Sequence, residues 1–338
     1  PGDQLADLMY NISVKPALEA LAVQKVQRGT MPSIPSNHGN TPVSDAALHC
    51  APTAQPRHAP GVAYVDDILE MEYALPHSTM CQNVTNMLQS AHLVLSSRGI
   101  FLNWEKVAVL VQPKPNDKAA IEFAVEYQGK TFRHANVSAY VTNVTKHVGT
   151  MQSIRGDAHA DVANRVKMMN LSQLPLKRAL AKCSSGFGTV MLGLGKALCD
   201  PALLYNLHTH TRIGTALTDK LSAKLCVLYR SCLGFKANQD QSGIWSRKSN
   251  TEVYLCAQQL EVHHKLTISR LFLLARVLRY APHALLYLLD EHFNACTPFA
   301  KRIHNDLDLV RLYTNAAKSL PPPQNDWAAW MTLSLIHI

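Results

Sequence analysis

The chain has 338 residues, of which 47% are hydrophobic and 17% charged, and its formal net charge is +9. This length exceeds one small domain, and the apolar content excludes wholesale disorder. Even the most apolar stretch, residues 266–289, contains Arg270, Arg276 and Arg279. A membrane span needs about 18 uninterrupted apolar residues. We therefore expect a protein that does not contact a membrane.

The eight cysteines contain no Cys-x-x-Cys pair, so the sequence predicts neither a zinc site nor a disulfide framework. Free cysteines favour an intracellular location, in the nucleus or the cytoplasm, over secretion. The chain starts at Pro1 without a signal-peptide pattern, and we interpret it as a fragment of a longer protein.

Positive charge is concentrated in the second half of the sequence. Residues 1–160 hold 12 Lys and Arg against 13 Asp and Glu, whereas residues 161–338 hold 21 against 11. A nucleic-acid-binding half beside an acidic catalytic half would give this distribution. A solvated basic helical surface would give it too, so charge alone leaves both interpretations open.

An amphipathic helix is predicted at the start of the chain by apolar residues spaced i, i+3, i+4 and i+7, namely Leu5, Leu8, Met9 and Ile12. Pro16 is expected to kink or interrupt this helix before residues 17–27. The Pro, Ser, Asn and His content of residues 31–60 predicts a long loop.

Residues 61–74 predict a β-hairpin, because the apolar runs Val62–Val65 and Ile68–Met71 flank Asp66 and Asp67. The two acids would then lie at the hairpin tip. Phosphoryl transfer uses two divalent cations, and such hard cations bind carboxylate oxygens. The pair is therefore a candidate metal site, with ordinary turn acids as the alternative.

Further elements are predicted up to residue 152. Apolar residues at helical spacing from Val84 to Leu95 predict a helix that ends at Gly99, and a strand follows at residues 107–111. Short alternating runs between residues 121 and 152, with a turn at Gln128–Lys130, predict antiparallel strands.

After Asp161 the pattern is helical almost to the end, with breaks predicted at Pro175, Asp200–Pro201, residues 238–249, Pro282 and residues 321–323. The predicted fold class is α+β. We expect three parts, an α+β part at residues 1–152 and two helical parts at residues 153–250 and 251–338.

Tyr64-Val65-Asp66-Asp67 matches the Tyr-x-Asp-Asp box of reverse transcriptases. Other segments match that family in the right order. Residues 1–12 resemble its glycine turn and helix, residues 99–106 its Gly-Leu-x-Leu-Asn-x-x-Lys segment, residues 146–151 its primer-grip turn, and residues 161–165 the start of its thumb. Over residues 1–165 the chain resembles a reverse transcriptase of the non-LTR (LINE-type) retrotransposons.

This resemblance implies an RNA-directed DNA polymerase, a nucleotidyltransferase that adds deoxynucleoside triphosphates to a primer 3′ hydroxyl. An RNA template and a DNA primer would be its nucleic-acid partners. The three expected parts would be a partial polymerase palm, a helical thumb and a helical C-terminal extension.

The resemblance also implies the site residues. Asp66 and Asp67 would bind two Mg²⁺ ions, with Mn²⁺ as an alternative, and Lys106 would assist departure of the pyrophosphate. Substrate contacts are implied for Gly2, Asp3, Tyr64, Val65 and Gly149.

The sequence departs from the family in several places. Gln4 stands where the family usually has proline, and residues 334–338 do not resemble it. The family's third metal-binding acid and its fingers would precede Pro1, so we expect the chain as given to be inactive.

Two other hypotheses stay open. The chain could be a non-catalytic nucleic-acid-binding remnant of a retroelement, in which case salt-sensitive binding would survive Asp66→Asn. It could also be an unrelated α+β protein with coincidental acids, and salt-dependent nucleic-acid binding would then be lacking.

Overall fold

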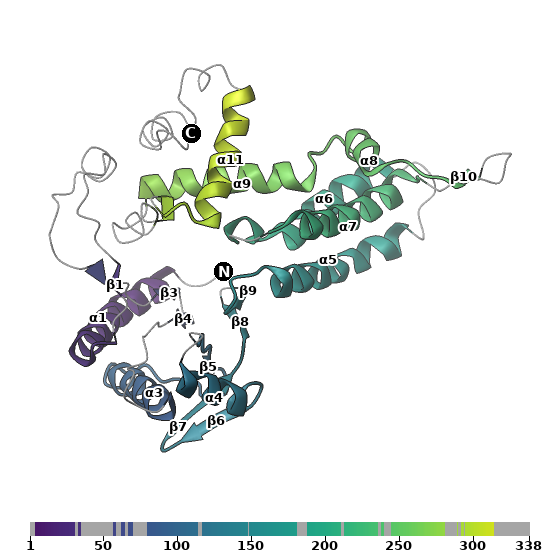
Figure 1. The fold of residues 1–338 in the computed structure, drawn as a ribbon. Helices are drawn as coiled ribbons and strands as arrows, with labels where there is room; N and C mark the ends of the chain where they lie inside the picture. The colour runs from purple at the N-terminus through teal and green to yellow at the C-terminus, as the bar shows by residue number, and fades with distance from the viewer. Residues whose placement is uncertain are drawn as a thin grey trace. The chain divides into compact units, whose positions relative to one another are not determined.

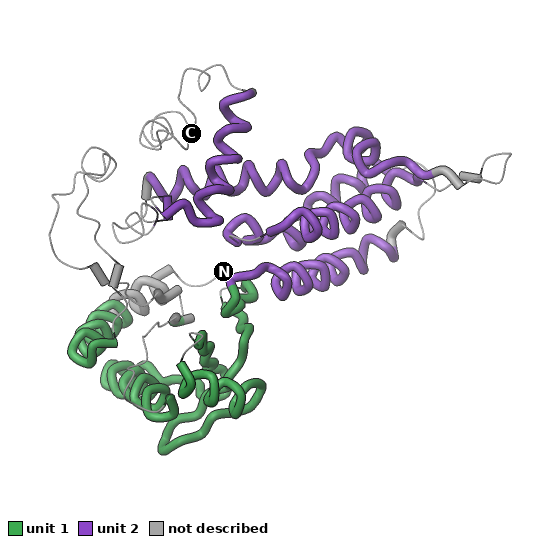
Figure 2. The backbone as a smooth tube through the Cα atoms, viewed as in Figure 1, with its two compact units in different colours: residues 1–155 green, residues 156–338 purple. Residues whose placement is uncertain are grey.

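The computed structural model describes residues 4–30, 33–34, 57–58, 62–64, 67–69, 80–113, 117–147, 149–180, 188–210, 213–235, 238–239, 245–280, 289, 292–293 and 295–313. Contacts divide the chain into two compact units, residues 1–155 and residues 156–338 (Figure 2). The predicted α+β class is confirmed, and helices predominate (Figure 1). Whether a further boundary lies near residue 250 stays a prediction.

The first unit contains α1 (Gln4–Arg28), β1 (Ser33–Ile34), β2 (Arg57–His58), β3 (Val62–Tyr64), β4 (Asp67–Leu69), α3 (Met80–Ser96), β5 (Ala108–Val109), α4 (Lys118–Tyr127), β6 (Thr131–His134), β7 (Val137–Val141), β8 (Val144–His147) and β9 (Thr150–Ser153). The second unit contains α5 (His159–Leu180), α6 (Gly188–Leu204), the 3₁₀ turn η1 (Leu207–Thr209), α7 (Thr215–Leu233), β10 (Asn238–Gln239), β11 (Trp245–Ser246), α8 (Asn250–Cys256), α9 (Val262–Tyr280) and α11 (Pro298–Tyr313). None of these helices is long and apolar enough to cross a membrane.

Helix α3 contributes to two apolar clusters within the described part of the first unit. Val84 and Leu88 pack against α4 and against a three-stranded sheet of order β5-β7-β6, in which β5 runs parallel and β6 antiparallel to β7. Val94 and Leu95 pack instead against α1. Helix α3 ends at Ser96, three residues before the predicted Gly99, and Gly99 closes the turn that follows with φ +75°.

Residues Phe123 to Tyr127, predicted as a strand, form helix α4, so this prediction was wrong. The side chain of Asp117 accepts a hydrogen bond of 3.0 Å from the backbone N–H of Ala120 and caps the helix. Phe123 is buried but Val125 is 78% exposed. The apolar alternation was therefore misleading, because only the residues at helical spacing are buried.

The proline breaks were also wrong where the structure describes them. Pro16, Pro175 and Pro201 all lie inside helices, α1, α5 and α6 respectively. Each helix keeps the same face buried on both sides of its proline. Burial of that face outweighs the one backbone hydrogen bond that a proline removes. The breaks predicted at Pro282 and residues 321–323 lie outside the described residues.

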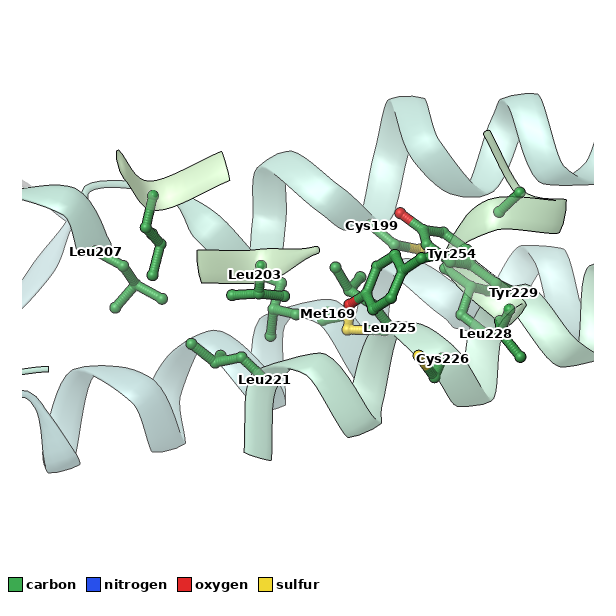
Figure 3. Packing of buried hydrophobic residues seen from close by; sticks show 14 of the residues in the cluster. Met169, Cys199, Leu203, Leu207, Leu221, Leu225, Cys226, Leu228, Tyr229 and Tyr254 are labelled. Carbon is green, nitrogen blue, oxygen red and sulfur yellow. The ribbon is translucent and has the colours of Figure 1, made fainter. Parts of the chain in front are cut away.

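The core of the second unit lies between α5, α6, α7, α8 and the start of α9 (Figure 3). Tyr229 and Tyr254 meet edge to face in it, with ring centroids 5.9 Å apart. Cys199, Cys226 and Cys232 are buried there as free thiols. Burial raises the pKa of each thiol, that of Cys199 to about 11, so all three stay protonated at neutral pH.

A buried carboxylate joins three helices of this unit. Asp200 of α6 accepts hydrogen bonds from the hydroxyl of Tyr229 on α7, at 2.9 and 2.7 Å, and from the Nζ of Lys265 on α9, at 2.5 Å. Burial and the neighbouring Asp200 raise the pKa of Tyr229 far above its usual range. The tyrosine therefore remains a neutral donor at any physiological pH.

A second buried ion pair joins α9 to α11. The guanidinium of Arg270 donates to both carboxylate oxygens of Asp306, at 2.6 and 2.9 Å, and both side chains are 4% exposed. The hydroxyl of Thr267 donates a third bond of 2.9 Å to the same carboxylate. Such a bidentate arrangement offsets much of the cost of burying the two charges.

Alanine substitution of two glycines in α6 tests the close approach of α6 and α7. A Cβ at Gly188 would lie 2.8 Å from the carbonyl oxygen of Cys232, whereas a Cβ at Gly193 would meet no atom within 4 Å. Gly193→Ala should raise the free energy of unfolding by about 0.5–1 kcal/mol through helix propensity. Gly188→Ala should lower it by about 1–3 kcal/mol through overpacking. Urea unfolding followed by circular dichroism measures both, and changes of equal sign would refute the packing described.

Asp306→Leu tests the second ion pair. It leaves Arg270 buried without a counter-charge, which should lower the free energy of unfolding of the second unit by about 3–5 kcal/mol. The double substitution Arg270→Met/Asp306→Leu should recover most of that loss, since no charge stays buried. The control Asp219→Asn, at an exposed position, should change stability by about 0.5 kcal/mol or less. Equal losses in the single and double variants would contradict this account.

Candidate functional site

The predicted Asp-Asp hairpin is present as a pair of antiparallel strands. Tyr64 pairs with Asp67, Ala63 with Ile68 and Val62 with Leu69. This register leaves Val65 and Asp66 as a two-residue connection, the shortest common hairpin loop. Asp67 is thus the first residue of β4, which corrects the prediction that both acids lie at the tip. Val65, Asp66 and the side chains of Tyr64 and Asp67 lie outside the described residues.

The hairpin is attached to the unit by the central residue of β4. Ile68 is half-buried and packs into the cluster of Ala17 and Leu21 from α1 and of Val94 and Leu95 from α3. A residue adjacent to Asp67 is therefore held on two helices. A site gains precision when its supporting residues are fixed by packing in this way.

Helix α1 begins at Gln4, where the sequence predicted a helix after a glycine turn. Its side chains are described from Val14 onward. Gly2 and Asp3 lie outside the described residues. Lys25 of the same helix is 1% exposed although it is charged.

Lys106 lies in the loop that joins α3 to β5. Ile100 and Leu102 pack into the same cluster as Ile68, so the loop and the Asp-Asp hairpin share one apolar support. Asn103 shapes the end of the loop, because its carbonyl accepts a hydrogen bond of 2.9 Å from the N–H of Lys106. Lys106 itself is exposed, as a residue that meets a charged substrate would be.

Gly149 lies in a second hairpin with a two-residue connection. In β8 and β9, His147 pairs with Thr150 and Lys146 with Met151, and Gly149 has φ +75°. Residues with a Cβ rarely adopt this backbone conformation, so the turn requires glycine. Among the described residues, this hairpin contributes no side chain to the cluster around Ile68.

The helix expected to open the thumb begins close to its predicted position. The side chain of Asp157 accepts a hydrogen bond of 3.2 Å from the N–H of His159, the first residue of α5. Asp161 is fully buried, with His210 at 3.0 Å and Arg165 at 3.4 Å. Sequence reasoning did not identify His210 as a partner, because 49 residues separate it from Asp161.

No group of three histidine, cysteine or carboxylate side chains suited to a metal ion occurs within the described part of the chain. Asp66 and the side chain of Asp67 do not belong to that part. The donor chemistry of the two acids suits Mg²⁺ and Mn²⁺, which prefer oxygen ligands.

The candidate site therefore consists of an Asp-Asp hairpin and a lysine loop on one apolar support, with a separate glycine hairpin nearer the helical unit in sequence. Comparisons of the chain with protein-family models, with curated proteins and with solved structures found no match. Any functional assignment consequently depends on the motif residues and on the elements that carry them.

Proposed function

We propose that the chain is part of an RNA-directed DNA polymerase of the non-LTR retrotransposon type. The main support is the match between motif order and element order. The Tyr-x-Asp-Asp box lies at the hairpin formed by β3 and β4. The Lys-His-Val-Gly segment lies at the hairpin formed by β8 and β9, where Gly149 has a left-handed backbone. A helix precedes the first hairpin and a helical unit follows the second. An unrelated protein would share this order of motifs and elements only by coincidence.

Asp66 and Asp67 would hold magnesium in this proposal, with manganese as a substitute. Two carboxylates from adjacent residues supply the oxygen donors that such ions prefer. When bound, the ions activate the attacking 3′ hydroxyl and neutralise charge on the triphosphate. The short hairpin and the anchored Ile68 would keep the two acids in a fixed position.

The other motif residues would bind substrates. Lys106 is exposed at the end of a packed loop, and its ammonium group would meet the triphosphate and stabilise the departing pyrophosphate. The backbone at Gly149 would approach the primer strand closely, because no side chain intervenes. The remaining contacts to template and incoming nucleotide would come from Gly2, Asp3, Tyr64 and Val65.

The helical unit would bind the duplex of template and primer. Lys220 and Lys224 are exposed one turn apart on α7. Like charges at this spacing repel each other on an isolated helix, by a few tenths of a kcal/mol. A phosphate backbone alongside α7 would attract both lysines and so offset the repulsion between them. The same residues would serve the alternative function, a non-catalytic nucleic-acid-binding remnant.

Primer extension with asparagine variants tests the catalytic proposal. The protein would be produced from its full open reading frame, and extension of a DNA primer on an RNA template would be measured with Mg²⁺. Asp66→Asn and Asp67→Asn should each lower the rate by roughly 10²-fold or more, the size of effect seen when charge stabilisation at a reacting centre is lost. Glu122→Gln, an exposed control on α4, should leave the rate unchanged.

Two outcomes would contradict the catalytic proposal. One is full activity in both asparagine variants of the hairpin. The other is a lack of extension by the unsubstituted protein although it binds an RNA–DNA duplex in a salt-dependent manner, which would support the binding remnant instead.

Salt dependence of duplex binding tests the role of α7. Lys220→Gln/Lys224→Gln should reduce the slope of log affinity against log salt concentration by about 2, since each phosphate contact contributes about 0.9. Fluorescence anisotropy with a labelled RNA–DNA duplex measures this slope. Lys15→Gln/Lys118→Gln removes the same charge from exposed positions of the first unit and should change the slope less. Equal slopes in the two double variants would exclude a specific role for α7.

A further inference from the structure

Helix α6 has its charged side chains on the buried side. The sequence of this helix contains two charged residues, Lys196 and Asp200. Asp200 is bound to Tyr229 and Lys265, and the Nζ of Lys196 donates to the carbonyl oxygen of Ala257 at 2.7 Å. Neither charge therefore contributes to the outer surface of the helix.

The outer face of α6 carries no charged side chain, and a row of apolar residues follows it. Val190, Leu194 and Leu198 are 59%, 45% and 48% exposed and follow one another at intervals of four residues. The other exposed positions on this face are uncharged, namely Thr189, Gly193, Ala197, Pro201 and the following Tyr205. The usual polar outer face of an amphipathic surface helix is therefore replaced here by a largely apolar one. This face consequently has the composition of an interface.

Helix α5 packs against α6 and exposes the apolar side chains Met168, Leu171 and Leu174, and every charge that it exposes is positive. The two helices pack against each other, and the guanidinium of Arg165 lies 4.7 Å from the centroid of the Tyr205 ring. On the described surface of α5 and α6, the exposed charged residues are Lys167, Lys177 and Arg178, and no carboxylate is exposed. The acids of both helices, Asp161 and Asp200, are buried.

We propose that this α5–α6 face binds an amphipathic helix of another polypeptide, whose apolar ridge lies on α6 and whose Asp or Glu side chains lie beside the cations of α5. The row formed by Val190, Leu194 and Leu198 is a ridge at i, i+4 spacing, which fits the groove of a second helix. Three exposed cations without a nearby exposed acid make acidic flanks favourable and basic flanks unfavourable.

Other occupants suit the face less well. A second copy placed face to face would bring the same cations of both α5 helices together, which is repulsive. A nucleic-acid backbone needs hydrogen-bond donors and cations along its contact. The ridge side chains of Val190, Leu194 and Leu198 offer neither.

Selection from a library of displayed peptides tests the proposal. Each peptide would be a helix with a fixed leucine ridge and with flanking positions randomised among Glu, Lys, Gln and Ser. Selection on the full 338-residue chain should enrich Glu at the flanks. The selected Glu-flanked peptide and its Lys-flanked counterpart would then be titrated with the chain and compared.

Substitutions locate the binding on this face. Leu194→Gln/Leu198→Gln should weaken binding of the Glu-flanked peptide by about tenfold or more, as loss of central apolar contacts does. Val227→Gln, a similar change at an exposed position of α7, should leave it unchanged. Lys177→Glu/Arg178→Glu should reverse the preference in favour of the Lys-flanked peptide. Circular dichroism of each variant verifies that the helices are retained.

Several results would overturn the proposal. These are equal binding of Glu-flanked and Lys-flanked peptides, absence of any enrichment, and binding that Leu194→Gln/Leu198→Gln does not weaken. The same double variant would also be compared with the unsubstituted chain for binding to anionic phosphatidylserine vesicles, for binding to an RNA–DNA duplex and for self-association by sedimentation. If the double variant kept peptide binding but lost vesicle binding, duplex binding or self-association, the face would be assigned to lipid, nucleic acid or a second copy, respectively.

Discussion

The second unit depends on the pairing of charges that its helices bury. An ionised carboxylate without partners in an apolar interior is too costly to retain, so each buried acid needs a donor from another helix. Asp200 obtains donors from α7 and α9, and Asp306 obtains them from α9. Helix α9 is thus linked to α6 through Lys265, near its start, and to α11 through Arg270, near its middle. Apolar packing holds the core together, and these pairs add polar links between its helices.

In the first unit, the candidate site depends on short turns and one anchored residue. The strands β8 and β9 are joined by a two-residue turn, in which Gly149 has a left-handed backbone. Ile68 fixes the first hairpin to α1 and α3, and the loop that ends at Lys106 packs on the same cluster. Ile68, Ile100 and Leu102 of the motif segments consequently have a structural role.

Local patterns predicted much of the fold, and their failures have physical causes. The helix before Gly99 and the hairpin around Asp66 were predicted because spacing and turn residues act over a few positions. Helix α4 was missed since a ten-residue segment can satisfy both a helical and a strand period. The proline breaks failed because tertiary burial outweighed local preference. The pairing of Asp200 with Lys265 joins residues 65 positions apart, and no local pattern encodes such a contact.

The apolar face of α6 also affects how the solubility of the isolated chain depends on salt. Copies of the chain would tend to adhere through this face, and the cations on α5, together with the net charge of +9, keep them apart. Salt screens that repulsion, since the Debye length falls to about 8 Å at physiological ionic strength. Added salt also strengthens apolar association when its ions are excluded from the surface. The protein should therefore be most soluble in dilute buffer and should precipitate as sulfate is added.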